Sequence, residues 1–136
     1  MVTSSALARR AGARSAYLVS LAECPTHRVL DRLGDRWVSL ILKELAGGPR
    51  RHGELTRAVA GATQKMLTQT LRGLERDGLV ARSVTATVPP RVDYRLTPLG
   101  ESLLPVMAVV TEWAERHIAD VDAARTAYDE AAVPRW

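Results

Sequence analysis

Residues 63–77 read TQKMLTQTLRGLERD and carry the clearest helical pattern of the chain. Leu67, Leu71 and Leu74 recur at spacings of four and three residues, which is the period of one helix face. Threonine, here Thr63, is a residue type that caps helix N-termini, and glycine, here Gly78, is one that ends helices. The sequence therefore predicts a helix over 63–77 that turns its leucines inward.

The opposite face of this predicted helix carries side chains suited to the major groove of DNA. They are Gln64, Lys65, Thr68, Gln69, Arg72 and Arg76. Glutamine makes paired hydrogen bonds to adenine, threonine contacts thymine methyl groups or phosphate, and Lys and Arg neutralise the backbone. We expect Gln64, Thr68 and Gln69 to read bases, and Lys65, Arg72 and Arg76 to contact phosphate. A merely solvated polar face is the alternative interpretation.

Three further helices are predicted upstream, over 26–33, 35–46 and 53–59, with a tight stop at 60–62. Thr26 is the predicted N-cap of the first and Asp35 of the second. Apolar residues recur in each at helical spacing, so all three should contribute to one core.

Downstream, the segments 79–84 and 92–96 have strand-like content and predict a hairpin whose long tip is centred on Pro89-Pro90-Arg91. Arg91 at this tip is placed to reach a minor groove or a flanking phosphate. Arg82 either supports it from the strand or is an ordinary solvated residue. The order of helix, helix, short helix, turn, helix, hairpin and long helix is that of a winged helix-turn-helix domain.

Thr97-Pro98 is a strong helix start, and the pattern continues to about Val121 or beyond. An apolar seam with a repeat close to 3.5 residues predicts a helix partner and hence a dimer interface. An amphipathic helix lying on its own domain is the alternative, and Pro105 should kink the helix in either case. The seam consists of Leu99, Leu103, Val106, Val110, Trp113 and His117.

Charge is distributed unevenly over the 136 residues, whose formal net charge is +4. Residues 50–91 contain eight basic and three acidic residues, whereas residues 98–136 contain three basic and seven acidic residues. This asymmetry indicates that the basic middle of the chain faces a polyanion, whereas the C-terminal part is acidic. The length fits one domain, which we divide into an N-terminal arm or short helix (1–23), the winged helix-turn-helix (24–97) and a C-terminal dimerisation helix and tail (98–136).

Cys24 is the single cysteine, which excludes an intrachain disulfide and a thiolate-clustered zinc site and fits a reducing compartment. The apolar run 16–22 is too short for an export signal or a membrane span. We therefore expect a cytoplasmic protein without a membrane partner.

Several motifs together resemble the HxlR family of bacterial regulators over about residues 24–117. They include Cys24-Pro25 through Trp37, the stretch 64–69, and Val88-Pro89-Pro90-Arg91-Val92-Asp93-Tyr94. The resemblance implies a MarR-like winged-helix homodimer that dimerises through terminal helices and binds palindromic promoter DNA. His52 and Gly73 depart from the family pattern, but neither lies on the base-reading face.

The resemblance leaves alternatives open. Some relatives use the cysteine corresponding to Cys24 as a redox or electrophile sensor, although a buried structural thiol is the commoner role. A small-molecule effector in a dimer-interface pocket, or a winged-helix protein-interaction module, would also fit. No metal or phosphate-loop motif and no catalytic arrangement can be recognised, so we expect neither an enzyme nor a cofactor.

Overall fold

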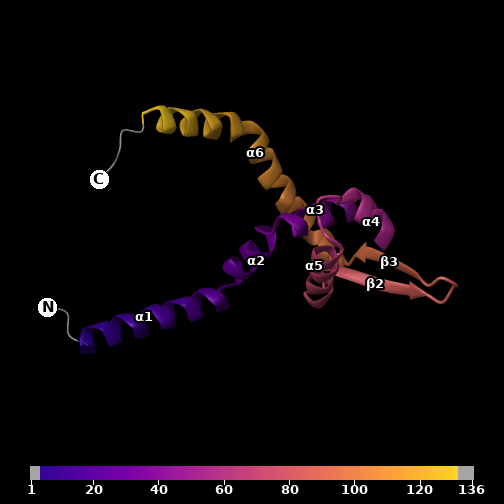
Figure 1. Cartoon of the computed structure of the whole chain (residues 1–136), viewed down its shortest axis with the longest axis horizontal. Coiled ribbons are helices and arrows are strands. Elements are labelled where there is room, and N and C mark those ends of the chain that lie inside the picture. The colour runs from indigo at the N-terminus through magenta and orange to yellow at the C-terminus, as the bar shows by residue number, and fades with distance from the viewer. Residues whose placement is uncertain (1–3, 132–136) are drawn as a thin grey trace.

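The computed structural model describes residues 4–131 as a mainly helical fold with one small antiparallel sheet (Figure 1). This confirms the predicted fold class. Along the chain the elements are α1 (Ser4–Glu23), α2 (Pro25–Leu33), α3 (Arg36–Leu45), β1 (Arg50–Arg51), α4 (His52–Ala58), α5 (Gln64–Arg76), β2 (Val80–Thr85), β3 (Arg91–Leu96) and α6 (Pro98–Glu130). The last five residues, part of the predicted C-terminal tail, lie outside the described residues, as do residues 1–3.

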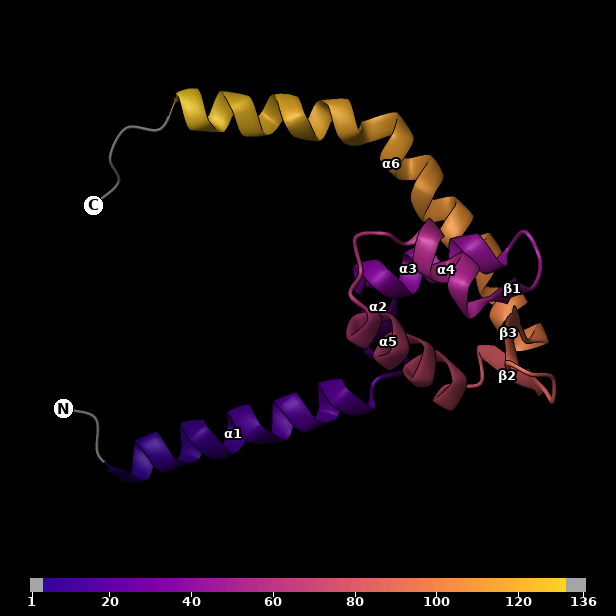
Figure 2. The same ribbon diagram turned by 45° about the vertical axis from the view of Figure 1, so that its right-hand side comes forward.

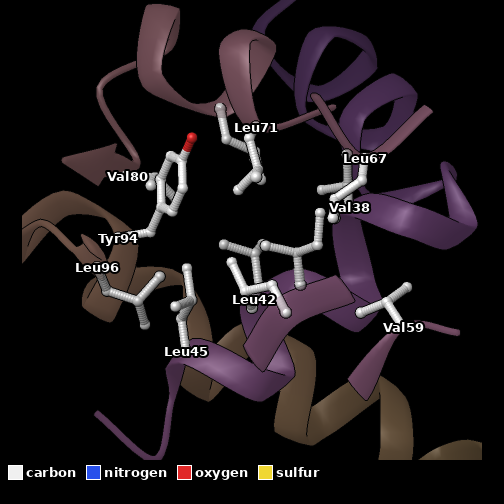
Figure 3. Close-up of a cluster of buried hydrophobic side chains, with 12 residues drawn as sticks. Val38, Leu42, Leu45, Val59, Leu67, Leu71, Val80, Tyr94 and Leu96 are labelled. Carbon is white, nitrogen blue, oxygen red and sulfur yellow. The ribbon is translucent and has the colours of Figure 1, made fainter. Parts of the chain in front are cut away.

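The core lies where α3, α4 and α5 meet the inner end of the sheet. Figure 3 shows Leu67 and Leu71 of α5 pointing toward Leu42 of α3, with Tyr94 of β3 alongside. Leu67, Leu71 and Leu74 are each about 1% exposed, as the leucine spacing predicted. Burying each such side chain stabilises the fold by about 1.5–3 kcal/mol, so this helix face fixes α5 against the domain.

Local side-chain caps set where the core helices begin. Asp35 Oδ1 accepts hydrogen bonds from the N–H groups of Trp37 at 2.8 Å and Val38 at 3.3 Å. Thr63 Oγ1 accepts one from Met66 N–H at 3.1 Å. Both caps were predicted. The predicted cap at Thr26 is wrong, because the N-cap of α2 is Cys24, two residues earlier, and Pro25 is the first residue of the helix. Proline suits that position because it has no N–H to leave unpaired.

The sheet has the strand order β1-β3-β2 and forms the wing. The pairs Val80↔Leu96, Arg82↔Tyr94 and Val84↔Val92 share one face, because side chains directly opposite in an antiparallel pair point to the same side. At its inner end this face joins the core through Val80, Tyr94 and Leu96. The two-residue strand β1, which pairs with β3, was not predicted, since two residues give no alternation to detect.

The start of α6 is fastened to the turn before β2. Thr97 Oγ1 donates to Gly78 O at 2.5 Å and accepts from Gly100 N–H at 3.1 Å, while Thr97 N–H donates to Leu79 O at 3.1 Å. Gly78 has φ of +76°, in the left-handed region that favours glycine. The predicted Thr97-Pro98 helix start is therefore confirmed, and it joins the wing to the last helix.

Two long helices, α1 and α6, leave the winged-helix body toward the same side (Figures 1 and 2). Helix α1 has 20 residues, longer than the predicted arm or short helix, because its alanine, leucine and arginine content suits an uninterrupted helix. Helix α6 has 33 residues, continues through Pro105, and bends along its length (Figure 2). Within residues 4–131, no helix combines the length and apolar character needed to cross a bilayer.

Candidate nucleic-acid interface

Helix α5 presents a polar and basic stripe on the side away from its buried leucines. Lys65, Gln69, Arg72 and Arg76 follow one another at spacings of four, three and four residues, and all four side chains are exposed. Their side chains take part in no hydrogen bond or ion pair within residues 4–131. Each is therefore available to a ligand outside the chain.

The other two predicted base readers lie differently. Gln64 is exposed, but its Nε2 donates to Thr56 Oγ1 of α4 at 3.4 Å, so reading a base would require exchanging this bond. Thr68 is half-buried on the flank of α5 that turns toward the wing. Gln69 is thus the least constrained of the three predicted base readers.

An ion pair holds the end of α5 in place. Arg32 of α2 contacts the C-cap residue Asp77 with two nitrogens: Nε lies 2.5 Å from Oδ2, and Nη2 lies 3.3 Å from Oδ1. The two side chains are 48% and 29% exposed, so the pair stabilises the fold by at most about 1 kcal/mol. Its geometry nevertheless ties the orientation of α5 to α2.

Arg91 lies at the first residue of β3, paired with Thr85 of β2, and the loop 86–90 extends beyond it. Its Nε donates to both oxygens of Asp93, at 3.0 and 3.2 Å. Arg91 is therefore at the outer end of the strand and already has an anionic partner. The sequence did not reveal this pairing, although Arg91 and Asp93 stand two residues apart, on one face of a strand.

A cavity of about 360 Å³ lies between α5 and the wing. Thr68, Arg72 and Glu75, spaced four and three residues apart, line it from α5. From the sheet it is lined by Arg82, Val92 and Tyr94, which lie on the face turned toward α5. His52, the first residue of α4, completes the lining. Arg82 and His52 thus join the candidate interface through packing that the sequence alone did not show.

The predicted dimer seam on α6 divides into two parts. Leu103 packs against the chain's own core, whereas Leu99, Val106, Val110 and Trp113 are 48–60% exposed. The half-buried His117 stacks on Trp113 with ring centroids 4.6 Å apart. Helix α1 adds further exposed apolar side chains, namely Leu7, Tyr17, Leu18 and Val19.

Cys24 is half-buried at the junction of α1 and α2. Its N–H donates to the carbonyls of Ser20 and Leu21, both at 3.1 Å. Cys24 therefore lies at the junction that links α1 to the winged-helix body.

Comparison with known proteins matches residues 32–122 to the HxlR-like helix-turn-helix family. The chain is 41% identical over 103 residues to the uncharacterized HTH-type transcriptional regulator YtfH of Escherichia coli, covering 76% of this chain and 82% of that protein. The solved structure of the ytfH regulator of Salmonella typhimurium is 40% identical, with a TM-score of 0.67 and coverage of 76% and 93%. The redox regulator HypR in its reduced form is 36% identical, with a TM-score of 0.69 and coverage of 74% and 99%. The chain therefore belongs to the HxlR-like helix-turn-helix family and is a DNA-binding transcriptional regulator.

Proposed function

We propose that this regulator is a cytoplasmic homodimer that represses nearby genes by binding a palindromic operator. The observation that carries the proposal is the stripe on α5, in which four exposed polar or basic side chains have no partner within the described chain while the opposite face is anchored in the core. A helix held rigidly from behind can present base-reading side chains at defined positions in the major groove.

The side chains of α5 have separate roles in this proposal. Gln64, Thr68 and Gln69 contact base edges near the N-terminal half of the helix, and Lys65, Arg72 and Arg76 contact the phosphates on either side. Arg91 of the wing contacts a flanking phosphate or the minor groove. To do so, it must give up its hydrogen bonds to Asp93 and bind DNA instead. Base contacts specify the sequence, and phosphate contacts supply salt-dependent affinity.

Paired variants of α5 test these roles. We expect Gln69→Ala to change the base preference at one position of each half-site, because a single bidentate contact distinguishes bases by about 1–3 kcal/mol. We expect Arg72→Ala to weaken binding to all sequences alike. A binding assay over a randomised DNA pool separates the two outcomes, and identical effects of both substitutions on every DNA would contradict the assignment.

Dimerisation is proposed through α1 and α6. Both helices project from the same side of the body and expose apolar side chains that no described part of the chain covers. Such surface on a soluble protein is typical of an interaction site. A two-fold dimer would place its two α5 helices at half-sites about one DNA turn apart, which is the geometry of an inverted repeat.

Redox control through Cys24 is a second candidate, favoured by the similarity to the redox regulator HypR. With one cysteine in the sequence, a disulfide would have to join two subunits, and an electrophile would have to form an adduct at Sγ. The position of Cys24 between α1 and α2 would let such a change alter the path of the α1 arm. Replacing Cys24 by Ser and measuring oxidant sensitivity of DNA binding tests this candidate.

A further inference from the structure

We infer that the cavity between α5 and the wing seats one backbone phosphate of the bound DNA, held between Arg72 and Arg82. This inference rests on the proposed function and assigns to Arg82 a phosphate-binding role that its place in the sequence left open. Arg72 comes from α5 and Arg82 from β2, so the two side chains line the cavity from different walls.

The electrostatics of the cavity favour an oxyanion. The side chains of Arg72 and Arg82 form no hydrogen bond or ion pair within residues 4–131, although Glu75 lines the same cavity. Two unpaired guanidinium groups against one carboxylate leave a net positive site. Guanidinium groups match the geometry of phosphate oxygens through paired N–H donors. Thr68 offers a hydroxyl and His52 a ring nitrogen at the same cavity.

The position of the cavity selects DNA as the source of the phosphate. A helix in the major groove has a phosphate strand along each edge of that groove. The cavity opens beside Thr68 and Arg72, which belong to the predicted DNA-binding face of α5, and its far wall is the wing. The DNA backbone on the side of the groove nearest the wing must therefore pass over this cavity when α5 enters the groove.

Sheet alternation supplies a matched control for Arg82. Arg82 pairs with Tyr94 on the face toward α5, whereas Arg95 pairs with Ala81 on the opposite face. Both arginines are exposed and lie on paired strands of the same wing. Removing either charge changes the net charge equally, so only a cavity-specific contact distinguishes the two.

The test measures binding to a 20-base-pair duplex of random sequence over a range of salt concentrations. For Arg82→Gln we expect the slope of log K against log salt to fall by about 0.9 for each cavity that engages DNA, which corresponds to about an eightfold loss of affinity per cavity at 0.1 M salt. Arg82→Lys should keep the slope, Arg95→Gln should match wild type, and Glu75→Gln should tighten binding. Thermal melting of each variant checks the fold.

The outcomes separate this inference from the proposed function. Wild-type protein that fails to bind the duplex at low salt overturns both. If the wild type binds but Arg82→Gln leaves the salt slope unchanged, only the inference that the cavity holds a phosphate is overturned. An equal fall in slope for Arg95→Gln has the same consequence. A cavity that takes free phosphate would instead show inorganic phosphate raising the melting temperature of wild type but not of Arg82→Gln, with equal DNA binding by both, and this result also overturns it.

Discussion

Substituting alanine for Gly100 tests the junction that joins the wing to α6. A Cβ on Gly100 would lie 2.1 Å from the carbonyl oxygen of Leu79 and 3.1 Å from its carbon, whereas real Cβ atoms essentially never approach closer than 3.0 Å. The obstacle is backbone, so no side-chain rotation relieves it. The start of α6 must move away from Leu79 by about 0.9 Å.

The cost of this movement follows from the contacts it disturbs. The Thr97 N–H bond to Leu79 O is lost, which costs about 1 kcal/mol. The Thr97 cap of α6 is weakened, which costs about 1 kcal/mol more. Overpacking against the neighbouring core adds about 1–3 kcal/mol. We expect Gly100→Ala to lower the free energy of unfolding by about 3–5 kcal/mol and the melting temperature by roughly 10 °C or more.

Urea denaturation followed by circular dichroism at fixed protein concentration measures this change. Gly73→Ala is the matched control, because its Cβ would meet only Arg32 Nη1 at an ordinary 3.7 Å. Alanine in place of glycine inside a helix should raise the free energy of unfolding by up to about 1 kcal/mol. Equal stability of Gly100→Ala and wild type would refute the close approach of α6 to the β2 turn.

Three further predictions address the cap of α3, the dimer and the thiol. Asp35→Ala removes the acceptor for Trp37 and Val38 and should lower the free energy of unfolding by about 1 kcal/mol in chemical denaturation, while Asp35→Ser should restore most of it. Trp113→Ala removes a 58% exposed aromatic ring from the proposed interface and should weaken dimerisation about tenfold or more in sedimentation equilibrium, with no change expected if α6 has no partner helix. Cys24→Ser should bind DNA like the wild type and, under redox control, lose all response to diamide; an equal response in both proteins would remove Cys24 as the sensor.

The sequence predicted the features that depend on neighbouring residues. Asp35, Thr63 and Thr97 cap their helices through side chains that reach backbone N–H groups two or three residues away, so residue type and position were enough. The buried face of α5 followed from the spacing of its leucines, since helical period alone sets which residues share a face.

Features that depend on distant residues were not predictable. The pairing of β1 with β3 joins segments about 40 residues apart through only two residue pairs. Gly100 acts through Leu79, which the wing brings close, and the cavity needs the register Arg82↔Tyr94 together with the stripe of α5. The length of α1 was underestimated because none of its residues from 5 to 23 is buried, and a helix without a buried face leaves only a weak apolar pattern in the sequence.

The α5 stripe should bind DNA in a sequence-selective manner. The most direct test is a salt series of binding between the purified protein and the intergenic DNA upstream of its own gene, with random DNA of equal length as the control. We expect tight binding to the intergenic DNA that weakens steeply with salt, and much weaker binding to random DNA. Absence of binding to either DNA at low salt would contradict it and would favour a winged-helix module that binds a protein.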